Sequence, residues 1–123
     1  MIRTSLVAAL AAALLLALGA SAYARADANR LKGTVGPGFT ISLTKSGQKV
    51  RTLKAGTYTL VVSDKSSIHN FVLEKSRGGK FEKAVTSVGF TGTKTIRVKL
   101  TAGKWQYYCA PHEASMRGTF TVK

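Results

Sequence analysis

The chain has 123 residues, the length of one domain, and contains one cysteine and two histidines. Lys and Arg together number 19 against 5 acidic residues, so the formal net charge is +14 and acidic partners are favoured. The single cysteine excludes an internal disulfide, and the basic residues form no long run typical of a dedicated nucleic-acid-binding segment.

The first 26 residues are predicted to be a secretory signal peptide. Arg3 and the free amine precede an apolar run over residues 6–18, and small residues follow it. Cleavage is expected after Ala24 or Ala26, and an uncleaved membrane anchor is the alternative, although the run is shorter than the roughly 20 apolar residues that a span needs. The remaining domain, residues 27–123, is expected to be a periplasmic or secreted monomer without a membrane span.

The rest of the chain is predicted to be all-β. Segments rich in β-branched and aromatic residues alternate with turn residues, and no helical periodicity is convincing outside the signal. Short strands at regular spacing favour an antiparallel sandwich or barrel. In chain order, strands are expected at Leu31–Val35, Phe39–Thr44, Tyr58–Asp64, His69–Lys75, Thr93–Leu100, Lys104–Cys109 and Thr119–Lys123.

The turn residues lead to three further predictions. Gly36-Pro37-Gly38 is expected to break the pairing between its flanking strands. The segment Ser76–Val88, with two adjacent glycines, could hold a helical turn or a loose loop. The run Leu53–Tyr58 is similar to Leu100–Trp105, and each is expected to launch a strand that leads to a candidate ligand, His69 or Cys109.

Four side chains form a candidate metal site. His69 lies 40 residues before the run Cys109-Ala110-Pro111-His112, and Met116 is the only methionine after the signal. Two neutral imidazoles and a thiolate in a trigonal plane, with a weak thioether above it, are the ligands of a blue-copper centre. A lone thiol in an oxidising compartment would also be protected by a metal, whereas the alternative is a buried, inert cysteine.

The motif His69-Asn70, Cys109-x-Pro111-His112 and Met116-x-Gly118 resembles the plastocyanin/pseudoazurin group of small type 1 copper proteins, the cupredoxins. The resemblance covers residues 31–123. It implies a Greek-key β-sandwich that holds copper at one end through His69, Cys109, His112 and Met116. It also implies that Asn70 ties the two ligand loops together.

Two details of the ligand loop bear on the copper chemistry. Pro111 lacks an N–H, which removes a possible hydrogen-bond donor to the sulfur and is expected to tune the reduction potential. The three residues between His112 and Met116 are one fewer than in plastocyanin and pseudoazurin and one more than in amicyanin. Glu113 or a backbone carbonyl could therefore replace Met116 as the axial donor, and Met116 would then be a core side chain.

The function expected from these residues is one-electron transfer between larger redox partners that present an acidic docking surface. Copper delivery without redox cycling is the alternative, although copper carriers more often use several methionines or exposed histidines. An enzyme is not expected, because no histidine is left for a second copper centre. Zinc can bind the same donor types, but the Irving–Williams order favours copper.

Overall fold

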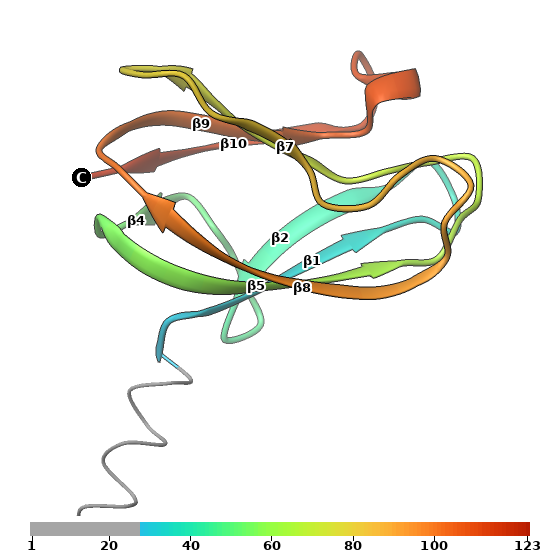
Figure 1. The fold of residues 1–123 in the computed structure, drawn as a ribbon, viewed down its shortest axis with the longest axis horizontal. Helices are drawn as coiled ribbons and strands as arrows, with labels where there is room; N and C mark the ends of the chain where they lie inside the picture. The colour runs from blue at the N-terminus through green and yellow to red at the C-terminus, as the bar shows by residue number, and fades with distance from the viewer. Residues whose placement is uncertain (1–27) are drawn as a thin grey trace, which may run out of the picture.

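The structure, a computed structural model, describes residues 28–123, which form two β-sheets packed face to face (Figure 1). The expected signal peptide and its cleavage site lie outside the described residues. The elements are β1 (Arg30–Val35), β2 (Ile41–Lys45), β3 (Gln48–Lys49), β4 (Thr52–Leu53), β5 (Gly56–Asp64), β6 (Val72–Arg77), β7 (Glu82–Ala84), β8 (Gly92–Leu100), β9 (Gly103–Tyr108), the 3₁₀ helix η1 (Ala110–His112) and β10 (Arg117–Val122).

The expectation of an all-β sandwich is confirmed. The first sheet has the strand order β3-β2-β1-β5-β8, and the second sheet has the order β4-β10-β9-β6-β7. The sheets are not purely antiparallel, because β1 pairs in parallel with β5 and β10 pairs in parallel with β4. Strands that are distant in sequence therefore lie side by side, as a sandwich with crossing connections requires.

The prediction that Gly36-Pro37-Gly38 breaks strand pairing was wrong. β1 and β2 pair antiparallel across this turn, from Lys32 opposite Thr44 to Val35 opposite Ile41. The Gly36 N–H donates a hydrogen bond to the Thr40 carbonyl at 2.9 Å, which closes the turn, and Gly36 has the positive φ of 72° that glycine tolerates. The residues that signal a break in a strand thus reverse the chain here without separating the strands.

Other differences concern strand ends. Phe39 and His69, each expected to be the first residue of a strand, lie in loops before β2 and β6. The uncertain segment Ser76–Val88 contains the short strand β7, and the two-residue strands β3 and β4 were not predicted. A strand of two or three residues is too short to give a period-two pattern, so its pairing depends on the neighbouring strand.

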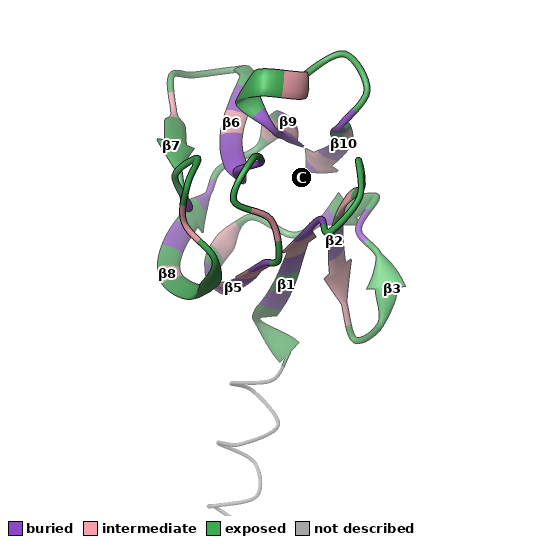
Figure 2. Ribbon diagram, turned by 90° about the vertical axis from the view of Figure 1, so that its right-hand side faces the viewer, coloured by how far each residue is buried: buried purple, intermediate pink, exposed green. Residues whose placement is uncertain are grey.

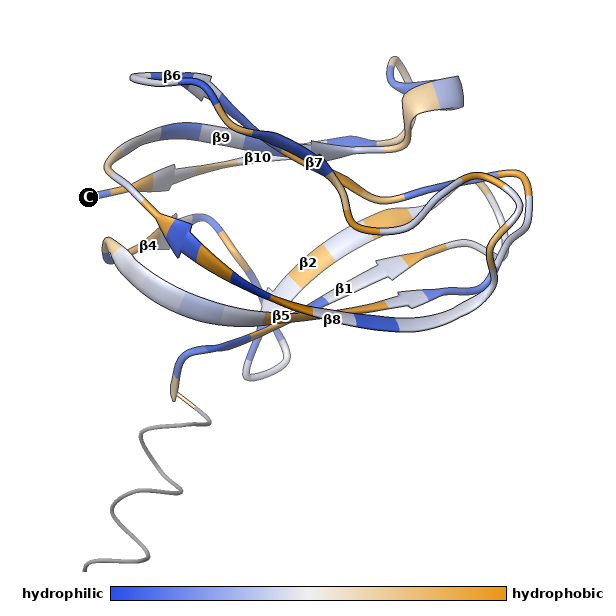
Figure 3. Ribbon diagram, in the orientation of Figure 1, coloured by the Kyte–Doolittle hydropathy of each residue, from blue (hydrophilic) through white to orange (hydrophobic). Residues whose placement is uncertain are grey.

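The core lies between the sheets and is built by alternation along the long strands (Figures 2 and 3). β5 has the burial pattern expected of a strand with one face inward, and Trp105 and Tyr107 of β9 point to the same interior. Tyr107 stacks on Phe71 with ring centroids 5.8 Å apart. The largest fully buried side chains include Trp105, Tyr107, Phe71, Leu31, Leu43, Leu60, Leu73, Leu100 and Met116.

Four loops meet at one end of the sandwich, which we call the loop end: residues 36–40, 64–71, 85–91 and 109–116. Figure 2 looks onto this end. Backbone hydrogen bonds join the loops, including Lys65 N–H to the Val35 carbonyl and Gly89 N–H to the Ser67 carbonyl. β5 and β9, launched by the two similar turns, both run toward the loop end, as the sequence predicts.

Gly118 is expected to be intolerant of a side chain. A Cβ added there would collide with the phenol ring of Tyr107, whereas one added at Gly38 would meet no atom within 4 Å. We predict that Gly118→Ala lowers the free energy of unfolding by about 1–3 kcal/mol, because overpacking forces neighbouring side chains out of place. Denaturant unfolding measures this loss, and Gly38→Ala is the matched control. Equal stabilities of the two variants would contradict the packing around Tyr107.

Candidate metal centre

Three donor atoms converge at the loop end. The Nδ1 atoms of His69 and His112 lie 3.0 Å apart, and the Cys109 Sγ lies 3.6 Å from the first and 3.7 Å from the second. His69 and Cys109 have no exposed surface, and His112 is half-buried. The structure thus brings together three of the four ligands expected from the sequence, although His69 and His112 are 43 residues apart in the chain.

The local structure of each loop explains this convergence. His69 lies between β5 and β6, in a loop whose backbone is held by hydrogen bonds to neighbouring loops. Cys109 directly follows β9, and η1 then turns the chain so that His112 returns toward the sulfur. Cys109 N–H donates to the Met116 carbonyl at 3.0 Å, and Met116 N–H donates to the His112 carbonyl at 2.9 Å. These bonds close the segment 109–116, the ligand loop, upon itself.

The donor triangle fits a first-row transition metal. A circle through three atoms separated by 3.0, 3.6 and 3.7 Å has a radius of about 2.0 Å, close to the metal–nitrogen and metal–sulfur bond lengths of such ions. One thiolate and two imidazoles are also the donors that copper prefers. Weak hydrogen bonds between pairs of these atoms would not require a point that lies one metal–ligand bond length from all three atoms. The residues present therefore fit a metal ion.

Asn70 joins the two ligand loops. Its Oδ1 accepts a hydrogen bond of 2.8 Å from the N–H of Ala110, which lies directly after Cys109. Asn70 is buried, so removing this acceptor would leave the Ala110 N–H without its partner. The bond fixes the position of His69 relative to Cys109, because Asn70 and Ala110 are the chain neighbours of these two residues.

Phe39, which was not predicted as a site residue, covers the two histidines. Its ring makes edge contacts with the imidazoles of His69 and His112 at centroid distances of 5.0 and 4.9 Å. The side chain is nevertheless 61% exposed. The only sequence signal was an aromatic residue beside the Gly36-Pro37-Gly38 turn, and nothing in the sequence indicated that this turn would reach the histidines.

Of the two side chains considered for the axial position, Met116 and Glu113, only Met116 is buried. Met116 is buried at the end of the ligand loop, directly before β10. Glu113 is exposed and is not part of the cluster of potential ligands formed by the two histidines and the cysteine. Pro111 lies in η1 between Cys109 and His112 and offers no N–H to the sulfur. Burial therefore favours Met116 over Glu113 as a weak fourth donor, and a backbone carbonyl stays the other alternative.

Beside the cysteine, Tyr108 is held neutral. Its hydroxyl donates a 2.7 Å hydrogen bond to Glu82. Burial, followed by the hydrogen bond and negative charge of Glu82, raises the pKa of Tyr108 far above its ordinary value. Burial also raises the pKa of Tyr107. These phenols therefore contribute packing and hydrogen bonds, and no anionic charge, to the strand that leads to Cys109.

One comparison with known proteins identifies a family, and another shows proteins of similar fold. The model of the copper-binding proteins of the plastocyanin/azurin family matches residues 42–123, which include both ligand loops. No match is found among curated proteins. Reduced rusticyanin is similar in structure, with a TM-score of 0.54 and 20% identity over 76% of this chain and 78% of that chain. Auracyanin A, a "blue" copper protein from Chloroflexus aurantiacus, has a TM-score of 0.53 and 17% identity over 76% of this chain and 98% of that chain.

Phe39→Ala is predicted to lower the reduction potential of the copper-loaded protein by an amount on the order of tens of millivolts. The apolar ring limits water access to the imidazoles, and more polar surroundings favour the more highly charged Cu(II) state. Voltammetry measures the shift. Val88→Ala, which removes another exposed apolar side chain at the loop end, is the control. An unchanged potential in Phe39→Ala would contradict a shielding role for the ring.

Proposed function

The chain belongs to the plastocyanin/azurin family of copper-binding proteins, and we propose that it carries single electrons between larger redox proteins. Copper is its cofactor, and His69, Cys109 and His112 form the type 1 site. Bound copper would supply the one-electron Cu(II)/Cu(I) couple. The observation that carries the proposal is the convergence of two imidazole nitrogens and one thiol sulfur on a single buried point.

The protein contributes a restrained donor set of which two members are fully buried. Cys109 and His69 are inaccessible to water, and the hydrogen bonds of Cys109, Ala110 and Met116 restrain the loops that bear the ligands. A donor set that moves little between two oxidation states lowers the reorganisation that accompanies each electron transfer. We propose that Met116 adds the weak axial donor, while Asn70 orients the ligand loops and Pro111 leaves the sulfur with fewer hydrogen-bond donors.

Exchange with a partner is proposed to occur at the loop end. His112 is the least buried of the three ligands, and Phe39 lies over it. The exposed apolar side chains Phe39, Ile68 and Val88 all belong to loops at this end. Lys65 and Arg117 are exposed there as well and favour an acidic partner surface, so the rate of exchange should fall as salt is raised.

Two further proposals follow from the sequence. We infer that the protein is exported to the periplasm or secreted, with residues 1–26 removed as a signal peptide. Among the residues that the structure describes, no helix is long and apolar enough to cross a membrane. We also infer that the protein is not an enzyme, since members of this family are electron carriers and both histidines already belong to one site.

Copper delivery is the competing function, and retention of Cu(I) separates it from electron transfer. The copper-loaded protein is reduced and reoxidised repeatedly in the presence of a high-affinity Cu(I) chelator. Electron transfer predicts that the copper stays bound and that each cycle is reversible, because the ligands are buried and their loops restrained. Stoichiometric loss of copper to the chelator in the reduced state would contradict the proposal and favour delivery.

Met116→Leu is predicted to leave copper bound while raising the reduction potential. Loss of a donor destabilises Cu(II) more than Cu(I), and a tenfold change in relative affinity corresponds to about 59 mV. Voltammetry measures the shift, and Glu113→Gln is the control for the alternative axial donor. A shift in Glu113→Gln without one in Met116→Leu would assign the axial position to the carboxylate.

A further inference from the structure

The outer face of the first sheet carries a set of cations. Residues paired directly across neighbouring strands point to the same side of a sheet, and side chains two residues apart along a strand share a face. Arg30 lies opposite Thr59, which lies opposite Arg97, and Lys32 lies opposite Thr44, which lies opposite Lys49. We call this surface the cationic face; its charged residues, all exposed, are Arg30, Lys32, Lys49, Arg97 and Lys99.

Hydroxyl side chains separate the charges on the cationic face. Threonines pair with the basic residues across neighbouring strands. Lys32 instead pairs with the apolar Val61 on one side, and Val61 in turn pairs with Thr95. Ammonium, guanidinium and hydroxyl groups are all donors to phosphate oxygens. The threonines in these rows are Thr44, Thr57, Thr59 and Thr95.

The described acidic residues lie elsewhere. Glu74 and Glu82 lie in the second sheet, where they accept hydrogen bonds of 2.7 Å from Gln106 and Tyr108. Glu113 lies in the ligand loop, and Asp64 is buried. No described carboxylate therefore neutralises the cationic face, although the second sheet carries charges of both signs.

The cationic face is not positioned for electron exchange. The ligand loop extends from β9 and β10 of the second sheet, whereas the cationic face is the outer surface of the first sheet (Figure 1). The copper ligands lie among the loops at one end of the sandwich, so a partner bound flat on this face would contact the side of the molecule and not the loop end. The excess charge thus points to a contact different from redox docking.

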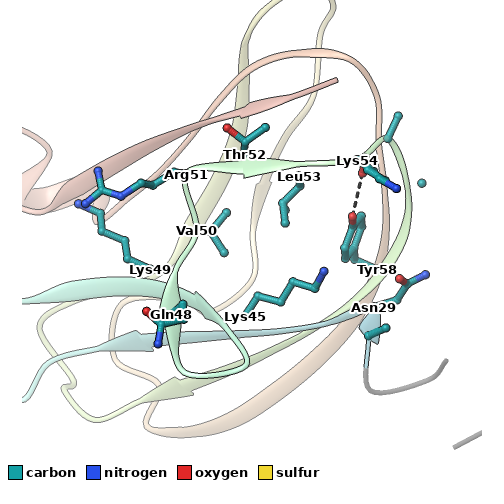
Figure 4. Close-up of a pocket in the computed structure, with 13 residues that line it drawn as sticks. Asn29, Lys45, Gln48, Lys49, Val50, Arg51, Thr52, Leu53, Lys54 and Tyr58 are labelled. Atoms are coloured by element: carbon teal, nitrogen blue, oxygen red, sulfur yellow. Dashed lines mark hydrogen bonds between the residues drawn. The ribbon is translucent and has the colours of Figure 1, made fainter. Parts of the chain in front are cut away.

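A hollow of about 640 Å³ extends this basic surface beyond the edge strand β3. Its lining includes Lys45, Lys49, Arg51 and Lys54 and no acidic residue. Figure 4 shows Lys49 and Arg51 extending to one side and Lys45 and Lys54 to the other, so the two pairs of charged ends diverge from each other. Diverging charges do not enclose one small anion, and they suit an extended anionic surface.

We propose that the cationic face binds a membrane surface rich in anionic phospholipid headgroups and leaves the loop end free for redox partners. Charge complementarity supports this occupant. The proposal does not depend on copper or on electron transfer.

The expected strength follows from the number of charges. Each Lys or Arg near an anionic membrane increases binding by about fivefold, and this attraction is screened within a Debye length. Removal of three cations from the face should therefore weaken membrane binding by on the order of a hundredfold. Removal of three distant cations should have a much smaller effect.

The test compares two variants of equal net charge in the domain of residues 28–123, which contains both sheets and the whole described core. The face variant is Lys32→Gln with Arg97→Gln and Lys99→Gln. The loop-end variant is Lys65→Gln with Lys94→Gln and Arg117→Gln, whose residues lie in or beside the loop end. Each is sedimented with vesicles of phosphatidylglycerol and phosphatidylcholine, and with vesicles of phosphatidylcholine alone, at low and high salt.

The proposal expects the unchanged domain and the loop-end variant to bind only the anionic vesicles, and the face variant to bind them about a hundredfold more weakly. Equal weakening of both variants would overturn it, because net charge alone would then govern binding. Binding to neutral vesicles, or no binding by the unchanged domain, would also overturn it. Face-dependent binding to soluble polyphosphate without vesicle binding would assign the face to an anionic polymer.

Discussion

A buried cysteine that must bind copper as a thiolate is the group that constrains this protein most strongly. Cys109 has no exposed surface, and an isolated anion in such a place is costly unless a cation compensates it. Two imidazole nitrogens stand within 3.7 Å of its sulfur, so a metal ion bound to all three atoms would supply the missing charge. Both ligand loops must therefore be held at one point, which explains why Asn70 and the closed loop from Cys109 to Met116 accompany the ligands.

The sandwich separates two kinds of surface. The loop end carries the half-buried His112 beneath an exposed aromatic ring, together with two further exposed apolar side chains. The outer side of the first sheet carries charge and hydroxyl groups, with one partly buried apolar residue among them. Basic side chains occur on both sheets, but the described acidic side chains lie away from the outer side of the first sheet. We propose that one surface exchanges electrons and that the other holds the protein at an anionic membrane.

The sequence predicted most of the long strands because their inward and outward residues alternate, as in β5 and β8. It also predicted the donor types, because a cysteine followed three residues later by a histidine is unusual in a chain with only two histidines. The short strands β3 and β4 carry no period of their own and were missed. Phe39 was missed as a site residue, since only the paired β1 and β2 bring its turn over the histidines.

The visible spectrum of the copper-loaded protein, compared with that of Cys109→Ser, tests the central claim most directly. Coordination by the Cys109 thiolate predicts an intense sulfur-to-copper charge-transfer band that gives a blue colour and disappears in the serine variant, because an alcohol oxygen cannot provide that transition. A pale spectrum of the unchanged protein, or a blue band that survives in Cys109→Ser, would contradict the type 1 site described above.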